Sequence, residues 1–469
     1  MARAESAEAV GKPTMEWKST AWLFAPARWA LWLLGPGPRI WWMLFDDSRW
    51  SALASVAIQT LGTILTAVAA RLLGQVGYGE LATLTTCAGW FGIIASYPTS
   101  GLIAQFRAEG LKTGEPYARR CATGLFLSLG FGATGMLVGL ALLRPALRYY
   151  HMSNLFWPGA LLCIMLPLAV PGGYSLYLLQ SFGRIALWSW MNLLFAVIPI
   201  GMLLVAAAWF SPLTVSSYVF AMLAANALTA ILGLALSART LSIGNLLRPD
   251  FSAARRMLQA GLGGFIASVS TSFAVLAVNT LIAKSAGRTA LGRYQLVTAI
   301  SGWVYAVVVS VSVPALSKWS GLAAEWRVRA LRRSLRMRQS GTGALSILAA
   351  ALAVAFAPSI LQVLYGAEYA QDALLLRLSV PAWIALGFGA WYWIAFTAMG
   401  HPGRVMSANV VWGGVQVATA WALIRWARMG AHGAMIAYAV AYVGWLATYE
   451  FVFRRTLHEA QTEAGQTDP

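Results

Sequence analysis

One stretch of the sequence, residues 51–92, recurs 213 positions later at residues 264–305 without a gap. Each copy reads as an apolar helix, a short basic turn that contains glycine, and a second apolar helix. The matched positions are Arg71 with Lys284, Gly74 with Gly287, Gly79 with Gly292, Thr85 with Thr298, and Gly89-Trp90 with Gly302-Trp303. Apolar segments share Ala and Val by composition alone, but turn glycines, a basic residue and a Gly-Trp pair in one register predict an internal repeat.

The composition places most of the chain in a membrane. Hydrophobic residues make up 59% of the sequence and charged residues 11%, whereas a soluble domain has about 25% charged residues. The length therefore predicts one large helical membrane domain rather than several soluble ones. The net charge of +18 does not indicate a nucleic-acid partner, because the positive residues lie in alternate loops between apolar segments.

Twelve apolar segments are long enough to cross a bilayer, which takes about 20 residues. They lie near residues 50–70, 80–104, 121–143, 155–179, 185–209, 214–238, 262–283, 291–316, 341–364, 374–398, 404–425 and 430–452. The repeat offset covers six of them, so the two halves should face the same way, related by an axis along the membrane normal. The sequence predicts an all-α membrane protein of about twelve transmembrane helices, in two six-helix bundles related by a parallel repeat around a central cavity.

The predicted organisation has five parts. They are a cytoplasmic segment 1–48 with Trp-rich interfacial helices, a first bundle 49–238, a cytoplasmic linker 239–260, a second bundle 261–453 and a cytoplasmic tail 454–469. A short re-entrant or thirteenth span is the alternative for the Trp-rich residues 17–47. Within the second bundle, the loop 317–340 carries hydrophobic residues between arginines, which predicts a basic amphipathic helix on the inner leaflet.

The distribution of Lys and Arg predicts the topology. With the N-terminus inside, 25 of the 34 basic residues fall in cytoplasmic segments and 9 in outer ones. Positive residues are retained on the cytoplasmic side, so both termini are expected in the cytoplasm.

Catalytic, metal and nucleotide-binding motifs are not found in the sequence. The glycines at Gly130, Gly132 and Gly135 have the GxGxxG spacing, but they lie inside an apolar span and indicate helix packing. The cysteines show no metal-ligand spacing. No catalytic residue, metal or cofactor is expected, and the protein is not expected to be an enzyme.

Acidic residues are absent from the first helix of each copy, between Ser51 and Ala70 and between Leu262 and Ala283. A cation-coupled antiporter usually needs a carboxylate within the membrane. The polar groups within these helices are instead amides, of which Gln59 and Asn279 are candidates to line the cavity. The alternative is that they only hydrogen-bond neighbouring helices.

Basic residues lie at both ends of the repeated helix pair. Arg71 and Lys284 are matched at the predicted outer turn, while Arg107 and Lys318 follow the second helix of each copy. An anionic phosphate that passes between the halves would need such cations, and Arg377 is a further candidate. The alternative for each is an anchor at the membrane interface.

Several of these motifs give the chain its resemblance to a known family. The residues concerned are Ala70–Gly79, Gly287–Tyr294, Tyr365–Tyr369 with Leu374–Arg377, the series Gly400, Arg404 and Asn409, and Gly430–Ala434. Over residues 50–452 the chain resembles lipid-linked oligosaccharide (polysaccharide) flippases of the multidrug/oligosaccharidyl-lipid/polysaccharide (MOP) superfamily. The resemblance implies two six-helix bundles around a cavity lined by the first, second, seventh and eighth spans.

The resemblance also implies a function. The expected substrate is an undecaprenyl-pyrophosphate-linked oligosaccharide, moved by alternating access from the inner to the outer leaflet of a bacterial cytoplasmic (inner) membrane. This step serves O-antigen, lipopolysaccharide or exopolysaccharide synthesis, with membrane lipids as surroundings and a polysaccharide polymerase and glycosyltransferases as candidate partners. The alternatives are a cation-coupled multidrug antiporter of the same fold, a major-facilitator transporter and a membrane-embedded glycosyltransferase.

Overall fold

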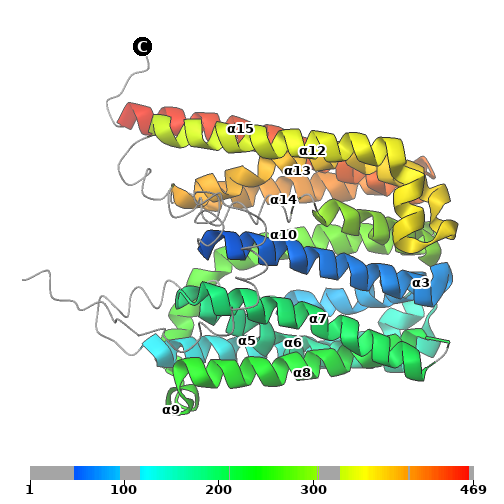
Figure 1. Cartoon of the computed structure of the whole chain (residues 1–469), viewed down its shortest axis with the longest axis horizontal. Helices are drawn as coiled ribbons and strands as arrows, with labels where there is room; N and C mark the ends of the chain where they lie inside the picture. Colours follow the sequence, from blue (N-terminus) through cyan, green and yellow to red (C-terminus); the bar gives the residue numbers. More distant parts are fainter. Residues whose placement is uncertain are drawn as a thin grey trace, which may run out of the picture. The chain divides into compact units, whose positions relative to one another are not determined.

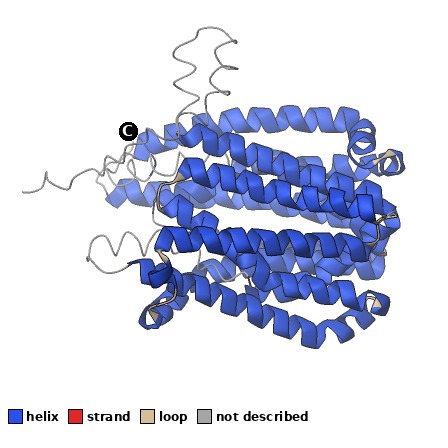
Figure 2. Ribbon diagram, turned by 60° about the horizontal axis from the view of Figure 1, so that its bottom comes forward, coloured by secondary structure: helices blue, strands red, loops and turns tan. Residues whose placement is uncertain are grey.

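The computed structural model describes residues 47–95, 117–210, 212–303, 305, 319, 328–399 and 402–463. Every regular element in these ranges is a helix and none is a strand (Figure 2). The prediction of an all-helical protein is therefore confirmed for this part of the chain. The predictions for the Trp-rich segment 17–46, Arg107 and Lys318 lie outside the described residues.

The first half of the chain begins with a helix that turns back on itself at a glycine. Helix α3 (Asp47–Ala95) is interrupted at Gly74, whose φ of 66° is a conformation that glycine adopts without steric cost. The two parts of α3 are the first two predicted helices and their turn. The helices that follow are α5 (Tyr117–Tyr149), η4 (Ser153–Leu155), α6 (Phe156–Ser181), α7 (Ile185–Trp209) and α8 (Val215–Leu241).

The second half begins after a short linker and repeats this turn. Gly287 has a φ of 92°, and it separates α10 (Ala254–Ser285) from a helix over 288–303. The matched glycines Gly74 and Gly287 therefore occupy matched turns. The other elements are α9 (Ile243–Leu246), η5 (Phe251–Ala253), α12 (Val328–Tyr365), η6 (Ala367–Asp372), α13 (Ala373–Ala398), α14 (Pro402–Trp421), η7 (Ala422–Trp426) and α15 (Gly430–Glu463).

Eight helical segments of the described chain are long and apolar enough to cross a membrane. One of them, Ala54–Ala95, contains both parts of α3. Helices α10 and α14 lie where spans are predicted, but they are not among the eight. The protein is thus a multi-pass membrane protein, and the count of twelve spans stays a prediction.

The helices pack mainly within each half of the chain. In the first half α6 lies against α5 and α8, and α7 packs beside α8 (Figure 1). In the second half α13 lies against α12 and α15, while α14 packs on α10 and α15 (Figure 1). Helix α5 also contacts α10, and this contact joins the halves.

Helices of the structure run across two of the predicted boundaries. Residues 328–340, predicted as part of a separate surface helix, form the first turns of α12 and continue into the span without a break. The helix tolerates Gly343 there because that position packs on Phe388, whose ring atom Cζ would lie 2.2 Å from an added Cβ. Helix α15 passes the predicted tail boundary at 454 and ends at Glu463, supported by ion pairs between residues four apart.

The linker between the halves is held by one carboxylate. Asp250 accepts hydrogen bonds from the side chain and the backbone N–H of Ser252, and it lies 3.9 Å from Arg120 of α5. These hydrogen bonds and the nearby arginines hold the pKa of Asp250 below its usual value.

Candidate functional site at the junction of the two halves

The repeat-matched glycines bring the two helix pairs into backbone contact. An added Cβ on Gly79 would lie 2.7 Å from the carbonyl oxygen of Arg288, and one on Gly292 would lie 3.1 Å from the Cα of Gly79. Distances this short leave no room for a side chain, so glycine is required for the helices to approach this closely. The halves of the chain are therefore in direct backbone contact at these two positions.

The matched Gly-Trp pairs lie along the same junction. Trp90 donates its indole N–H to Thr280 Oγ1 at 3.1 Å, and Trp303 donates to Thr63 Oγ1 at 2.6 Å. Each tryptophan of one half therefore hydrogen-bonds the first helix of the other half. Since buried polar groups on membrane helices need such partners, these bonds fix the register between the halves.

The predicted amides Gln59 and Asn279 lie on these same first helices. Gln59 is half-buried, and its Nε2 would lie 3.3 Å from a Cβ on Gly302. Asn279 is 5% exposed, and its Oδ1 has no hydrogen-bond partner within the described residues.

The matched cations Arg71 and Lys284 each bind the end of a helix from the other half. Arg71 donates from Nε to the carbonyl of Leu364 at 3.0 Å and from Nη2 to that of Val363, at the end of α12. Lys284 donates to the carbonyl of Tyr149 at 2.5 Å, at the end of α5, and lies 4.2 Å from its ring centroid. The last carbonyls of a helix lack internal partners and carry partial negative charge, so a cation is favoured there.

Three more side chains extend these contacts and complete what we call the junction network: Arg71, Gln75, Lys284, Arg288 and Arg293. Arg288 forms an ion pair with Glu80 at 3.4 Å and donates to the carbonyl of His151 at 2.5 Å. Arg293 forms an ion pair with Asp372 at 3.3 Å and donates to Gln75 Oε1 at 2.7 Å, and Gln75 Nε2 donates to the carbonyl of Glu368 at 2.8 Å.

The junction network lies at the end of the helix pairs that carries the turns at Gly74 and Gly287. Sequence reasoning identified two of its five members. Arg288 directly follows the turn glycine Gly287, and Arg293 directly follows the contact glycine Gly292. This adjacency is the feature of the sequence from which both arginines could have been predicted as members.

Arg377 has a local role away from this junction. Its Nε donates to the carbonyl of Val354 at 3.1 Å, between α13 and α12 of the same half. Pro358 follows Val354 by four residues and has no N–H, so this carbonyl loses its helical partner. Arg377 supplies the missing donor.

A cavity of about 710 Å³ lies beside the junction. Its lining includes Thr85, Gly89 and Gly92 of α3, Ser128 of α5, Asn226 of α8 and Ser268 of α10. The cavity implied by the family resemblance is lined by the first, second, seventh and eighth spans. This one is lined instead by the second predicted span, by α5, α6 and α8, and by Ser268 of the seventh, with no described residue of the first or eighth. Among the described residues that line this first-half cavity, none is charged.

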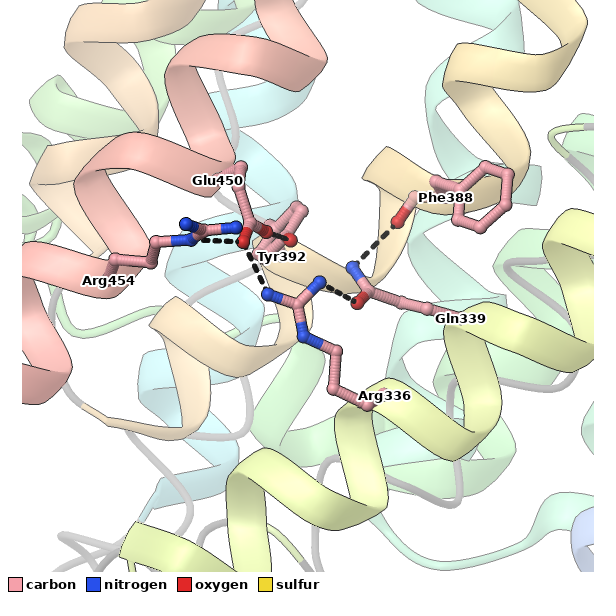
Figure 3. Close-up of polar contacts among 6 residues, drawn as sticks. All are labelled: Arg336, Gln339, Phe388, Tyr392, Glu450 and Arg454. Atoms are coloured by element: carbon pink, nitrogen blue, oxygen red, sulfur yellow. Dashed lines mark hydrogen bonds and ion pairs between the residues drawn. The ribbon is translucent and has the colours of Figure 1, made fainter.

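A second polar cluster lies wholly within the second half. The Glu450 carboxylate on α15 accepts from Arg454 Nε at 2.5 Å, from Arg336 of α12 and from the hydroxyl of Tyr392 on α13 (Figure 3). Arg336 also donates to Gln339 Oε1 at 3.4 Å. Gln339 Nε2 donates in turn to the carbonyl of Phe388 at 2.9 Å (Figure 3). The cluster ties three helices of one half to one another.

The chain matches a known protein family over more than half of its length. The model of a family described as polysaccharide biosynthesis protein matches residues 44–320. The chain belongs to this family. A search of curated proteins by sequence found no match.

Solved structures with the same fold are transporters of the MOP superfamily. An inward-facing multidrug resistance MATE family transporter matches with a TM-score of 0.67 at 16% identity, over 90% of this chain and 97% of that one. An outward-facing one matches with a TM-score of 0.63 at 16% identity, over 89% and 97%. A MOP superfamily transporter from Pyrococcus furiosus, described with a binding pocket of reverse polarity, matches with a TM-score of 0.64 at 16% identity, over 89% and 97%.

Proposed function

We propose that this polysaccharide biosynthesis protein is a flippase for an undecaprenyl-pyrophosphate-linked oligosaccharide. In this proposal two six-helix bundles, twelve spans in all, pass the glycan headgroup from the inner to the outer leaflet of a bacterial cytoplasmic membrane. The observation that carries the proposal is the junction network, in which cations of one half bind acceptors of the other beside the turns at Gly74 and Gly287. The first-half cavity beside it offers uncharged polar groups, as a glycan requires.

The network suggests how the junction opens. Arg71 and Lys284 bind carbonyl oxygens, which are weaker acceptors for a charged donor than phosphate oxygens. A pyrophosphate that reaches the junction would take these donors from the helix ends, and the halves would separate there. A membrane potential that is negative inside favours outward movement of an anion by about 2.3 kcal/mol per charge per 100 mV.

A cation-coupled multidrug antiporter is the second candidate, since the structural neighbours include multidrug transporters. Such an antiporter needs a carboxylate that changes its charge during the cycle. Glu80 and Glu450 are each paired with an arginine. Asp372 is paired with Arg293, but its second carboxylate oxygen, Oδ2, is buried without a hydrogen-bond partner within the described residues. No acidic residue lies between Ser51 and Ala70 or between Leu262 and Ala283, in the first helix of each half. This acid-free pair of helices, and not the ion pairs, supports the flippase over the antiporter.

The test is export of lipid-linked oligosaccharide in cells that lack the chromosomal copy and any redundant flippase. Arg71→Ala with Lys284→Ala should abolish export while membrane insertion is retained, and Arg71→Lys should have a milder effect. The control is Arg148→Ala with Arg425→Ala, which removes the same charge from two exposed side chains.

Normal export in cells without the protein would contradict the flippase. Normal export by the Arg71/Lys284 double variant would mean that both residues only anchor their helices at the membrane interface. Drug efflux abolished by collapse of an ion gradient would favour the antiporter.

A further inference from the structure

An aromatic face runs along α15 in the second half. Tyr438, Tyr442, Trp445 and Tyr449 follow one another at spacings of four, three and four residues, which places them on one side of the helix. Successive ring centroids lie 4.6, 5.9 and 4.4 Å apart. Helix α8, which packs on α6 as α15 packs on α13, carries no tryptophan. The corresponding helix of the first half therefore lacks such a face.

Two amides of α14 point at the aromatic face. Asn409 Oδ1 accepts from Trp445 Nε1 at 2.9 Å and from the Tyr449 hydroxyl at 3.0 Å. These two bonds fix the amide so that its Nδ2 donors are directed away from both rings. Gln416, two turns further along α14, is 7% exposed and borders the same small cavity as Asn409. Its amide is therefore placed to hydrogen-bond a polar group that enters this space.

These side chains surround a small cavity between α10, α14 and α15. Its volume is about 80 Å³, and its lining includes Asn409, Trp412, Gln416, Tyr438, Tyr442 and Trp445. None of the described residues that line it is charged. The cavity does not suit a phosphate, because a desolvated anion would need an opposite charge. Aromatic rings can also hold an organic cation, and a competing ammonium ion therefore has to be part of the test.

We propose that this α14–α15 cavity is a subsite for a neutral sugar, which rests on the proposed flippase function and names where part of the glycan binds. A pyranose has an apolar C–H face and polar hydroxyl edges. The cavity admits a hydroxyl or hydroxymethyl edge to the amides of Asn409 and Gln416, while the ring face lies on the aromatic side chains at its mouth. The pyrophosphate would bind the cations of the junction network instead.

The test measures sugar binding by the full-length protein in nanodiscs with saturation-transfer NMR. The probes are methyl glycosides of glucose, galactose, mannose and N-acetylglucosamine, with a lipophilic quaternary ammonium ion as a charged competitor. At least one glycoside should bind, and Gln416→Met, which keeps length but removes the donors, should weaken it about fivefold or more. Tyr442→Phe, which keeps the ring, should have a smaller effect.

The control is Gln371→Met, an exposed glutamine on η6, which should bind like the wild type. The subsite is wrong if no glycoside binds, if Gln416→Met binds every glycoside unchanged while it remains folded, or if only the ammonium ion binds. The subsite and the proposed function can fail independently. If the protein exports lipid-linked oligosaccharide but shows no Gln416-dependent binding, the flippase function stands and the subsite is wrong. If it binds glycosides through Gln416 but exports no lipid-linked oligosaccharide, the subsite stands and the flippase function is wrong.

Discussion

The junction network and the Glu450 cluster are both built from arginines and carboxylates, but they join different parts of the molecule. The network connects α3 and α5 to the helices after the linker. The cluster connects α12, α13 and α15, which all belong to one half (Figure 3). If the halves move against each other, the first set of contacts must break and the second can persist. The network is therefore expected to control conformation, and the cluster to control folding.

The largest expected effect is on stability, at the cluster. Glu450→Ala would leave the buried hydroxyl of Tyr392 without its acceptor, and the more exposed Arg336 and Arg454 without their shared carboxylate. We expect the free energy of unfolding to fall by about 2–3 kcal/mol, because an unpaired buried donor is costly, while the exposed arginines contribute little. Chemical denaturation in detergent measures this, and transport per folded molecule should change little. A variant of normal stability that cannot transport would place the cluster in the transport cycle instead.

A matched pair of glycines tests the contact between the halves. Gly79→Ala would place its Cβ 2.7 Å from the Arg288 carbonyl, whereas Gly62→Ala has no atom within 4 Å of its Cβ. We expect Gly79→Ala to lose about 1–3 kcal/mol by overpacking and Gly62→Ala to lose nothing. Unfolding of the two variants under the same conditions gives the comparison. Equal stability would mean that the glycine contact is not close in the protein.

The smallest effect is expected at the indole hydrogen bonds across the junction. Trp303→Phe removes the bond to Thr63 and keeps the ring, and the loss should be about 0.6 kcal/mol, as for other hydrogen bonds between membrane helices. A double-mutant cycle with Thr63→Val isolates the pair. A coupling energy near zero would remove these bonds from the description of the junction.

Much of the fold followed from local sequence signals. The turn glycines Gly74 and Gly287 were identifiable because each ends an apolar run, and each adopts positive φ in the structure. The surface helix predicted at 317–340 failed as a separate element for residues 328–340, since no strong helix breaker separates them from the span that follows. A charge pattern alone does not show where a helix leaves the membrane surface.

The site was predictable in its residues but not in their partners. Arg71 and Lys284 were identified as a matched pair, yet their acceptors are backbone carbonyls of helices more than 100 residues away. Every residue has a backbone carbonyl, so the sequence does not show which of them will accept a hydrogen bond from a distant side chain. The role of Arg377 depended likewise on the carbonyl freed by Pro358, which could be recognised only after the two helices were placed side by side.

The central claim is that the halves separate at the junction network when a lipid-linked substrate binds. Its direct measurement is the distance between spin labels at Arg148 of the first half and Gln371 of the second, which are both exposed. The native Cys87, Cys121 and Cys163 are buried and interfere little with labelling. We expect one short distance without substrate, a second, longer population with undecaprenyl-pyrophosphate-linked oligosaccharide, and that longer population without substrate in the Arg71→Ala/Lys284→Ala variant. A single unchanged distance in all three samples would contradict the account.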